Sequence, residues 1–260
     1  MTTELTPLVL TAFSGGVVAL LLTLFGGGGS VLAVPLLLYV VGVADPHVAI
    51  GVSAAGVALN ALTALAGHAR AGRVRWPCAT LFAITGAAGA WFGSSLAKMI
   101  DGHQLLLIFA VAMVAVGVSM LRPKATVARV EPRLNWAMSP RVGMAGAGVG
   151  SAAGFFGIGG GFLIVPGLMA STGMSLATAQ ATSLLSVAAF GATTAGNYAL
   201  SGWVDPGLVT AMAVGGVAGT AAGLPLARRL GSNARLGRIL FAGLILVVAA
   251  YVAVRALLAL

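Results

Sequence analysis

Charged side chains are scarce in this 260-residue chain, where Asp, Glu, Lys and Arg together make up 7% of the residues. A water-soluble domain gives about a quarter of its residues to charge, because charged groups cover its surface. Hydrophobic residues instead make up 59% of this chain, and its mean hydropathy is +1.06. Most of the outer surface is therefore expected to face lipid, which predicts an all-α polytopic membrane protein.

Acidic residues and cysteine are almost missing, and this excludes several kinds of chemistry. The single cysteine, Cys78, excludes an internal disulfide and a Cys/His metal framework. No GxxxxGK[ST] phosphate loop occurs, which excludes ATP hydrolysis by that route. The five carboxylates fall at a terminus or between apolar runs, so neither a buried proton relay nor a hydrolase is predicted. These carboxylates are Glu4, Asp45, Asp101, Glu131 and Asp205. No enzyme activity, cofactor or metal is expected.

Basic residues outnumber acidic ones by 14 to 5 and give a net charge of +9. Nucleic-acid-binding domains gather such residues on one polar face. Here 12 of the 14 lie in three gaps between apolar runs, at 70–75, 122–141 and 228–238. Membrane proteins mark their cytoplasmic loops in this way, so the pattern favours membrane orientation over nucleic-acid binding.

The apolar runs differ in length, and a spanning helix needs about 20 such residues. Six runs reach or approach this length, at 46–67, 77–97, 104–121, 175–199, 206–227 and 236–258. Four shorter runs form two pairs, 8–25 with 31–43 and 142–156 with 162–172. Each pair is joined by a glycine-rich stretch.

The two short pairs are copies of one another. FGGGGSVLAVP at 25–35 matches FGIGGGFLIVP at 156–166 in a constant register, and after a gap of a single position the matches continue. A register held over about 70 residues indicates an internal duplication. The later matches include Gly86 with Gly216, Gly89 with Gly219 and Gly93 with Gly223.

Charge predicts how the two copies are oriented, because the positive-inside rule places all three basic gaps in the cytoplasm. Two long runs and one short pair separate residue 141 from residue 228. The pair must then cross an even number of times, as a re-entrant hairpin or as two short spans. Each half crosses an odd number of times, so the halves are inverted and both termini are periplasmic.

The predicted organisation is therefore a first repeat at 1–121, a cytoplasmic linker at 122–141 and a second repeat at 142–260. Each repeat is a short glycine-interrupted helical pair followed by three transmembrane helices. The expected location is the inner membrane of a bacterium.

The glycine stretches are the first candidates for a substrate site. Unpaired backbone groups in lipid cost several kcal/mol, so irregular backbone is expected only inside protein or beside a water-filled cavity. The short flanking runs place both stretches near the bilayer midplane, where inverted-repeat transporters bind substrate. Free N–H groups at a helix N-terminus bind anions, and Ser30 is predicted to cap such a helix. Close packing of helices is the alternative explanation. The candidates are Gly27, Gly28, Gly29, Ser30, Gly159, Gly160 and Gly161.

Polar side chains within the long runs are the second group of candidates. Ser and Thr hydroxyls can bond the carbonyl one turn back, which gives them a structural alternative. Amides need several partners, so Asn60 and Gln180 are the stronger candidates. The group comprises Ser53, Asn60, Gln180, Thr182, Ser183 and Asn197.

Histidine and lysine fall at the ends of runs. His47, His68 and His103 are expected to be solvated at the interface, with no spacing that indicates a metal site. Lys98 is expected to extend its ammonium group to the membrane surface.

The two glycine motifs, the segments Gly51-Val-Ser53 and Ala181-Thr-Ser183 and the doubled glycine-spaced helices together resemble the TauE/SafE family of sulfite exporters. The resemblance covers nearly the whole chain except the linker. It implies a membrane transporter that exports a small sulfur-containing anion, sulfite or an organosulfonate. Gly51-Val-Ser53 differs from the Gly-Thr-Ser more usual in the family by the loss of one hydroxyl.

Three functions stay open on the sequence alone. The first is export of a sulfur-containing anion, driven by the membrane potential or by secondary coupling. A potential that is negative inside drives each negative charge outward with about 2.3 kcal/mol per 100 mV. The second is transport of a different small anion, or import, and the third is a non-transporting membrane assembly subunit. The expected partners are a small anionic substrate and the lipid bilayer, and the oligomeric state stays open.

Overall fold

The computed structural model describes residues 2–121, 138–157, 161–230, 243 and 245–255, and within these the regular structure is helical throughout. The first half contains α1 (Thr2–Phe25), η1 (Gly26–Leu32), α2 (Ala33–Leu36), η2 (Leu37–Val41), α3 (Pro46–Arg70), α4 (Trp76–Ala97) and α5 (Gly102–Leu121). The second half contains α6 (Ser139–Phe156), α7 (Gly161–Thr172), α8 (Leu176–Ala199) and α9 (Pro206–Leu230), followed by a helical segment at Ile245–Arg255.

The long helices follow the apolar runs closely. The runs at 46–67, 77–97, 175–199 and 206–227 correspond to α3, α4, α8 and α9 to within three residues at either end. The run at 104–121 lies in α5, whereas the run at 236–258 lies partly outside the described residues. Apolar length therefore predicted these helices correctly.

The first run of the chain was counted among the short runs, and the helix that contains it is longer than the run. α1 has 24 residues, and 21 of them, Leu5–Phe25, are apolar enough to cross a membrane. The helix begins before the apolar stretch, at Thr2, and includes Pro7. Hydropathy marks only the apolar part, so the polar turns that precede it were missed.

Both halves turn at the same places. Six described glycines have a positive φ, a conformation that costs glycine little, and no other described residue has one. They form three pairs, and the third pair is closer in sequence by a single position than the first two. The register of the duplication, including its gap, therefore recurs in the backbone. The pairs are Gly26 with Gly157, Gly42 with Gly173 and Gly72 with Gly202.

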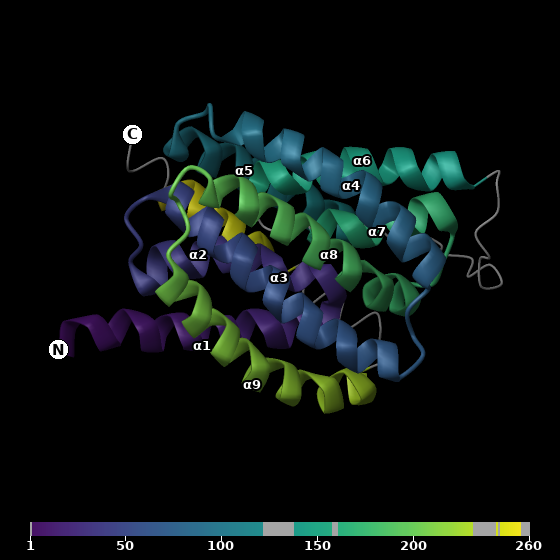
Figure 1. Cartoon of the computed structure of the whole chain (residues 1–260), viewed down its shortest axis with the longest axis horizontal. Coiled ribbons are helices and arrows are strands. Elements are labelled where there is room, and N and C mark those ends of the chain that lie inside the picture. The colour runs from purple at the N-terminus through teal and green to yellow at the C-terminus, as the bar shows by residue number, and fades with distance from the viewer. Residues whose placement is uncertain (1, 122–137, 158–160, 231–242, 244, 256–260) are drawn as a thin grey trace.

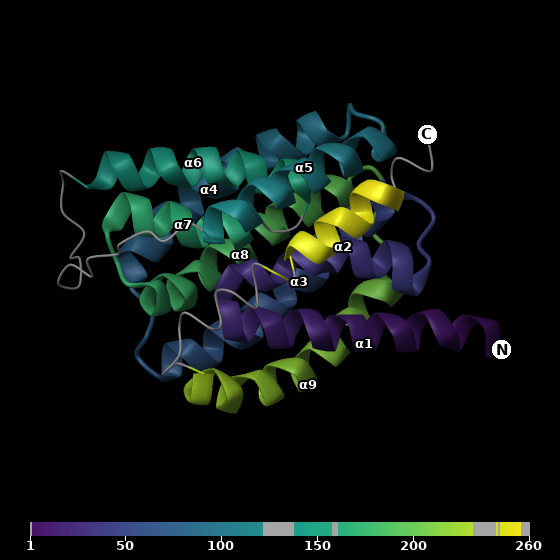
Figure 2. The same ribbon diagram turned by 180° about the vertical axis from the view of Figure 1, so that it is seen from behind.

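Helices from different halves pack side by side along the two edges of the molecule (Figures 1 and 2). α1 lies against α9 at one edge. A methyl group placed on Gly215 of α9 would meet the backbone of Ala12, and one turn on, a methyl group on Gly219 would meet that of Gly16. Residue numbers rise together on both helices, so α1 and α9 run in the same direction.

The opposite edge repeats this arrangement with α4 and α6. A methyl group on Gly150 would meet the backbone of Gly86, and one on Gly154 would meet that of Ala90. α4 and α6 therefore also run in the same direction. Small residues at four-residue spacing permit this close approach of backbones in both places.

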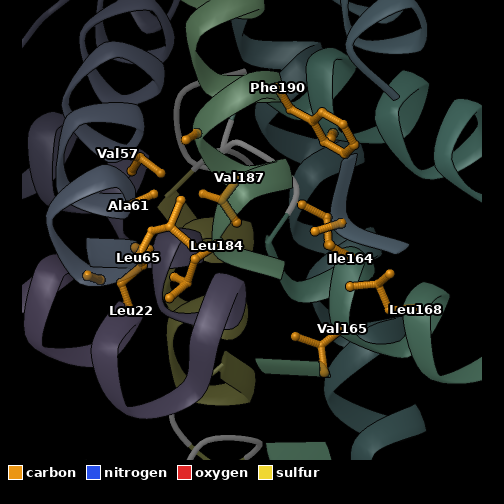
Figure 3. Packing of buried hydrophobic residues seen from close by; sticks show 14 of the residues in the cluster. Leu22, Val57, Ala61, Leu65, Ile164, Val165, Leu168, Leu184, Val187 and Phe190 are labelled. Carbon is orange, nitrogen blue, oxygen red and sulfur yellow. The ribbon is translucent and has the colours of Figure 1, made fainter. Parts of the chain in front are cut away.

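α3 and α8 lie between the two edges and form the centre of the molecule (Figure 1). Their buried apolar side chains face each other, with α7 contributing Ile164, Val165 and Leu168 on one side (Figure 3). Gly191 of α8 lies against Ala54 near the start of α3, while Thr182, near the start of α8, contacts Arg75, which follows α3. The two central helices therefore run in opposite directions.

The outer faces of the helices are apolar. Ile84 of α4, Met144 of α6 and Val214 of α9 are 71%, 76% and 71% exposed, and further exposed large apolar side chains lie on α4 and α9. Contiguous exposed apolar surface of this kind is unfavourable in water and suited to hydrocarbon. Together with five helices long and apolar enough to cross a membrane among the described residues, it makes the chain a multi-pass membrane protein.

Candidate functional site

The first glycine stretch begins with a turn that packs on the other half of the molecule. α1 ends at Phe25, and Gly26 then takes a φ of +64°. A Cβ atom at Gly26 would lie 2.7 Å from both the Cα and the carbonyl oxygen of Gln180 in α8. Only glycine fits this turn, because it combines a left-handed backbone with direct contact to the backbone of α8.

The second stretch repeats this arrangement at Gly157, which has a φ of +65°. A Cβ atom there would collide with the side chain of Ile50 in α3, and Ile50 is the repeat counterpart of Gln180. The Oγ of Ser53 lies 2.9 Å from the carbonyl oxygen of Ile50 and 3.1 Å from that of Gly157. Each glycine turn therefore rests at the same place on the central helix of the opposite half.

The two turns lie toward opposite ends of the central helices. Ile50 and Gln180 are each the fifth residue of their helix, and α3 and α8 contain 25 and 24 residues. At 1.5 Å per residue, each turn contacts its central helix about 11 Å from the middle of that helix. The sequence predicts that both glycine stretches lie near the bilayer midplane, but α1 runs its full length before the chain turns.

The stretch that follows Gly26 is helical and was expected to be irregular. Gly27, Gly28, Gly29 and Ser30 all lie within the 3₁₀ helix η1, which continues into α2. The predicted N-cap role of Ser30 was wrong, since Phe25 precedes η1 and Leu32 precedes α2 as capping residues. Glycine carries no hydrophobic periodicity, so this helix left no signal in the pattern.

Packing explains at least one glycine of this stretch. Gly28, Gly29 and Ser30 are buried, and a Cβ atom at Gly29 would collide with the backbone of Leu21 and Leu22 in α1. The alternative explanation, close helix packing, therefore accounts for Gly29.

The corresponding residues of the second half are only partly visible. Gly161 is the first residue of α7, while Gly159 and Gly160 lie outside the described residues. η1 and α7, the helical segments that follow the glycine turns of the two halves, pack against each other.

The polar candidates on α8 have different surroundings. Thr182 accepts a hydrogen bond from the backbone N–H of Arg75 at 3.2 Å, which holds the α3–α4 turn onto α8. Ser183 donates to the carbonyl oxygen of Gln180 at 2.8 Å. Gln180 is half-buried beside Gly26, and its side-chain amide has no hydrogen bond within the described part of the chain. Gln180 is therefore the candidate on α8 whose side chain forms no described hydrogen bond.

Asn60 is 1% exposed and faces α1 and α9. Its Nδ2 donates to the carbonyl oxygen of Gly15 at 3.4 Å, and its Oδ1 has no partner among the described residues. The side chain packs on Gly216, as its repeat counterpart Phe190 packs on Gly86.

The structure therefore does not gather the predicted residues into one cluster. Ser53 adjoins one glycine turn, Gln180 and Ser183 the other, and Asn60 a helix interface.

A polar network that the sequence did not predict joins α4 to α8. The ammonium group of Lys98 donates to Asn197 Oδ1 at 2.8 Å, to the Asn197 carbonyl at 3.1 Å and to Ser201 Oγ at 3.0 Å. Asn197 Nδ2 in turn donates to the hydroxyls of Ser94 and Ser95 at 2.7 and 2.9 Å. Lys98 is half-buried at the end of α4, and these bonds hold its ammonium group beside the exposed α8–α9 turn. That the group reaches the membrane surface stays a prediction.

The histidines are less solvated than expected. His68 is only 8% exposed, and its Nε2 lies 3.4 Å from the carbonyl oxygen of Thr23. His47 is half-buried and stacks on Trp203, with ring centroids 4.6 Å apart. The side chain of His103 lies outside the described residues. Position at the end of an apolar run did not reveal this burial, because neighbouring helices cover the ring.

Comparison with known proteins gives a consistent result. Residues 11–252 match the family described as Sulfite exporter TauE/SafE. Two relatives, each named "Probable membrane transporter protein", come from Xylella fastidiosa strains Temecula1 and 9a5c. They are 46% and 45% identical to this chain over 246 residues, which is 94% of both chains. The "Probable membrane transporter protein YdhB" of Bacillus subtilis is 26% identical over 204 residues, 76% of this chain and 80% of the relative. No solved structure gives a significant match. The chain is a membrane transporter, not an enzyme, and it belongs to the TauE/SafE sulfite exporter family.

Proposed function

We propose that this protein exports a small sulfur-containing oxyanion, sulfite or an organosulfonate, from the cytoplasm. The observation that carries the proposal is the family match, which covers residues 11–252. The buried polar side chains support it. Among the described residues they are hydroxyls, amides and one imidazole, without a carboxylate. Uncharged donors suit an anion that must be released as readily as it is bound.

The proposed architecture is a pair of inverted repeats at 1–121 and 142–260, joined by a cytoplasmic linker at 122–141. The directions of the helices support inversion. Copies with the same orientation would place the counterparts α3 and α8 parallel, whereas they run antiparallel. In an inverted pair, α1 and α9 run in the same direction, as they do here. Both termini are then periplasmic in the inner membrane of a bacterium.

The proposed path for the anion lies along the α3–α8 pair and past the two glycine turns. Gln180 and Ser183 adjoin the turn at Gly26, and Ser53 adjoins the turn at Gly157. Each turn belongs to one half and rests on the other half. Movement of one half against the other therefore changes both contacts, which is the motion that alternating access requires.

Uptake of labelled sulfite into inside-out membrane vesicles tests this function. Vesicles that contain the protein are expected to take up sulfite and to show competition by methanesulfonate but not by acetate. Matched vesicles without the protein provide the baseline. Uptake that does not exceed the baseline for sulfite or methanesulfonate contradicts the proposed substrate class. Selective uptake of acetate instead favours the second function left open by the sequence.

A further inference from the structure

Two repeat-related positions near the ends of the central helices carry buried polar rings. His68 of α3 and Tyr198 of α8 are counterparts in the same register that pairs Ile50 with Gln180. His68 is 8% exposed and Tyr198 is 0% exposed. Both positions therefore carry a large polar ring, although the two side chains differ.

Each ring has a polar atom without a hydrogen-bond partner among the described residues. These atoms are Nδ1 of His68 and Oη of Tyr198. The other ring nitrogen of His68 lies 3.4 Å from the carbonyl of Thr23, so that side of the ring is occupied. Burial of an unpaired donor or acceptor destabilises the fold. A pair of such atoms at equivalent positions points to a ligand that both recognise.

Both rings lie next to a glycine turn. Thr23, the neighbour of His68, precedes the turn residue Gly26 by three positions. The ring centroid of Tyr198 lies 6.1 Å from that of His47. His47 precedes Ile50 by one helical turn, and Ile50 contacts Gly157. Tyr198 and Ile50 also share one buried cluster. Each ring therefore lies near one of the two turns, and the two rings lie on opposite sides of the middle of the bundle.

We propose that the Tyr198 hydroxyl and the His68 imidazole are two successive contacts for the transported oxyanion, one at each glycine turn. This inference rests on the proposed function. The Tyr198 O–H group can donate to an oxygen of the anion. In the neutral ring of His68, Nε2–H donates to the Thr23 carbonyl, so the free Nδ1 can accept from the O–H group of a singly protonated oxyanion. Neither side chain binds as strongly as the planar, permanently charged fork of arginine, so the anion can leave each contact.

The substitution Tyr198→Phe tests the first contact because it removes a single oxygen atom that bonds nothing else described in the protein. A purely structural role predicts unchanged or higher thermal stability and unchanged transport. The inference predicts unchanged stability and a rise in KM for sulfite of about tenfold or more, as expected for a lost hydrogen bond to a charged group. Tyr39→Phe, which makes the same chemical change in η2 beside Tyr251, is the matched control and should leave KM unchanged.

His68 is tested with two substitutions, so that loss of folding is recognised. His68→Gln keeps a hydrogen-bond acceptor and is expected to retain part of the transport. His68→Leu removes the acceptor and is expected to raise KM as Tyr198→Phe does. Equal transport per folded molecule in both variants contradicts a contact at this position.

A binding measurement separates this inference from the proposed function. Trp203 lies 5.8 Å from Tyr198, between ring centroids, so its fluorescence reports on this contact when Trp76, Trp91 and Trp136 are replaced by Phe. Sulfite is expected to change the emission of this variant with saturation, and Tyr198→Phe is expected to weaken the binding about tenfold. Sulfite transport by the wild type with an unchanged affinity in Tyr198→Phe overturns only this inference. Absence of sulfite transport by the wild type overturns the proposed function, and this inference with it.

Discussion

At the scale of single residues, glycine serves two distinguishable purposes in this chain. Some glycines lie where a side chain would meet a neighbouring backbone, as Gly29 does against Leu21 and Leu22. Others, such as Gly196 of α8, have open space where a side chain would be. The glycine content by itself does not separate the two groups, and only the first is required for the fold.

The substitution Gly29→Ala is expected to lower the folded yield and the melting temperature, because its methyl group collides with the backbone of α1. Gly196→Ala is the matched control. It should be neutral or stabilise the protein by about 0.5–1 kcal/mol, the helix preference of alanine over glycine. Both effects are measured by thermal unfolding of purified protein in detergent. A normal melting temperature for Gly29→Ala with lost transport contradicts the packing explanation and restores Gly29 as a ligand contact.

At the scale of helices, the Lys98–Asn197 network is the densest described set of side-chain hydrogen bonds between the two halves. It fastens the end of α4 to the end of α8. The repeat counterpart of Asn197 is Gly67, which packs against Leu224 of α9 without any side-chain hydrogen bond. The two equivalent interfaces therefore differ in polar contacts, because α3–α9 has one described side-chain hydrogen bond, between Thr63 and Thr220 at 3.1 Å.

Lys98→Met is expected to destabilise the protein by about 1–2 kcal/mol, because Asn197 loses its strongest hydrogen-bond donor. The methionine keeps most of the apolar length of lysine, so lost packing contributes little. Arg70→Met, at an exposed helix end, removes a charge without breaking a described hydrogen bond and should leave the melting temperature unchanged. Equal melting temperatures for the two variants would argue against a stabilising network.

The sequence predicts elements better than it predicts contacts between them. The boundaries of α3, α4, α8 and α9 follow from apolar length, and the repeat register follows from the paired glycines. The helical form of η1 was missed, because glycine has no side chain to produce a periodic pattern. The bond from Ser53 to Gly157 joins residues 104 positions apart, and only the packing of complete helices brings them together. The burial of His68 has the same origin.

At the scale of the whole molecule, the proposed inversion assigns the α3–α4 and α8–α9 turns to opposite faces of the membrane. Ala71 and Leu200 are exposed residues at these turns. In a Cys78→Ala background, Ala71→Cys should react with an impermeant maleimide only from the cytoplasmic side, and Leu200→Cys only from the periplasmic side. The assay compares intact cells with inside-out vesicles. Labelling of both positions from one side contradicts the inverted arrangement.

We propose that the protein moves its anion down the membrane potential, without the help of a carboxylate among the described buried residues. Purified protein in liposomes, with the potential set by a potassium gradient and valinomycin and with equal pH on both sides, tests it most directly. Labelled sulfite is expected to move toward the positive side, to reverse when the potential is reversed and to gain about 2.3 kcal/mol per charge for each 100 mV. Sulfite flux that does not respond to the potential, or that requires a pH gradient, would contradict the account.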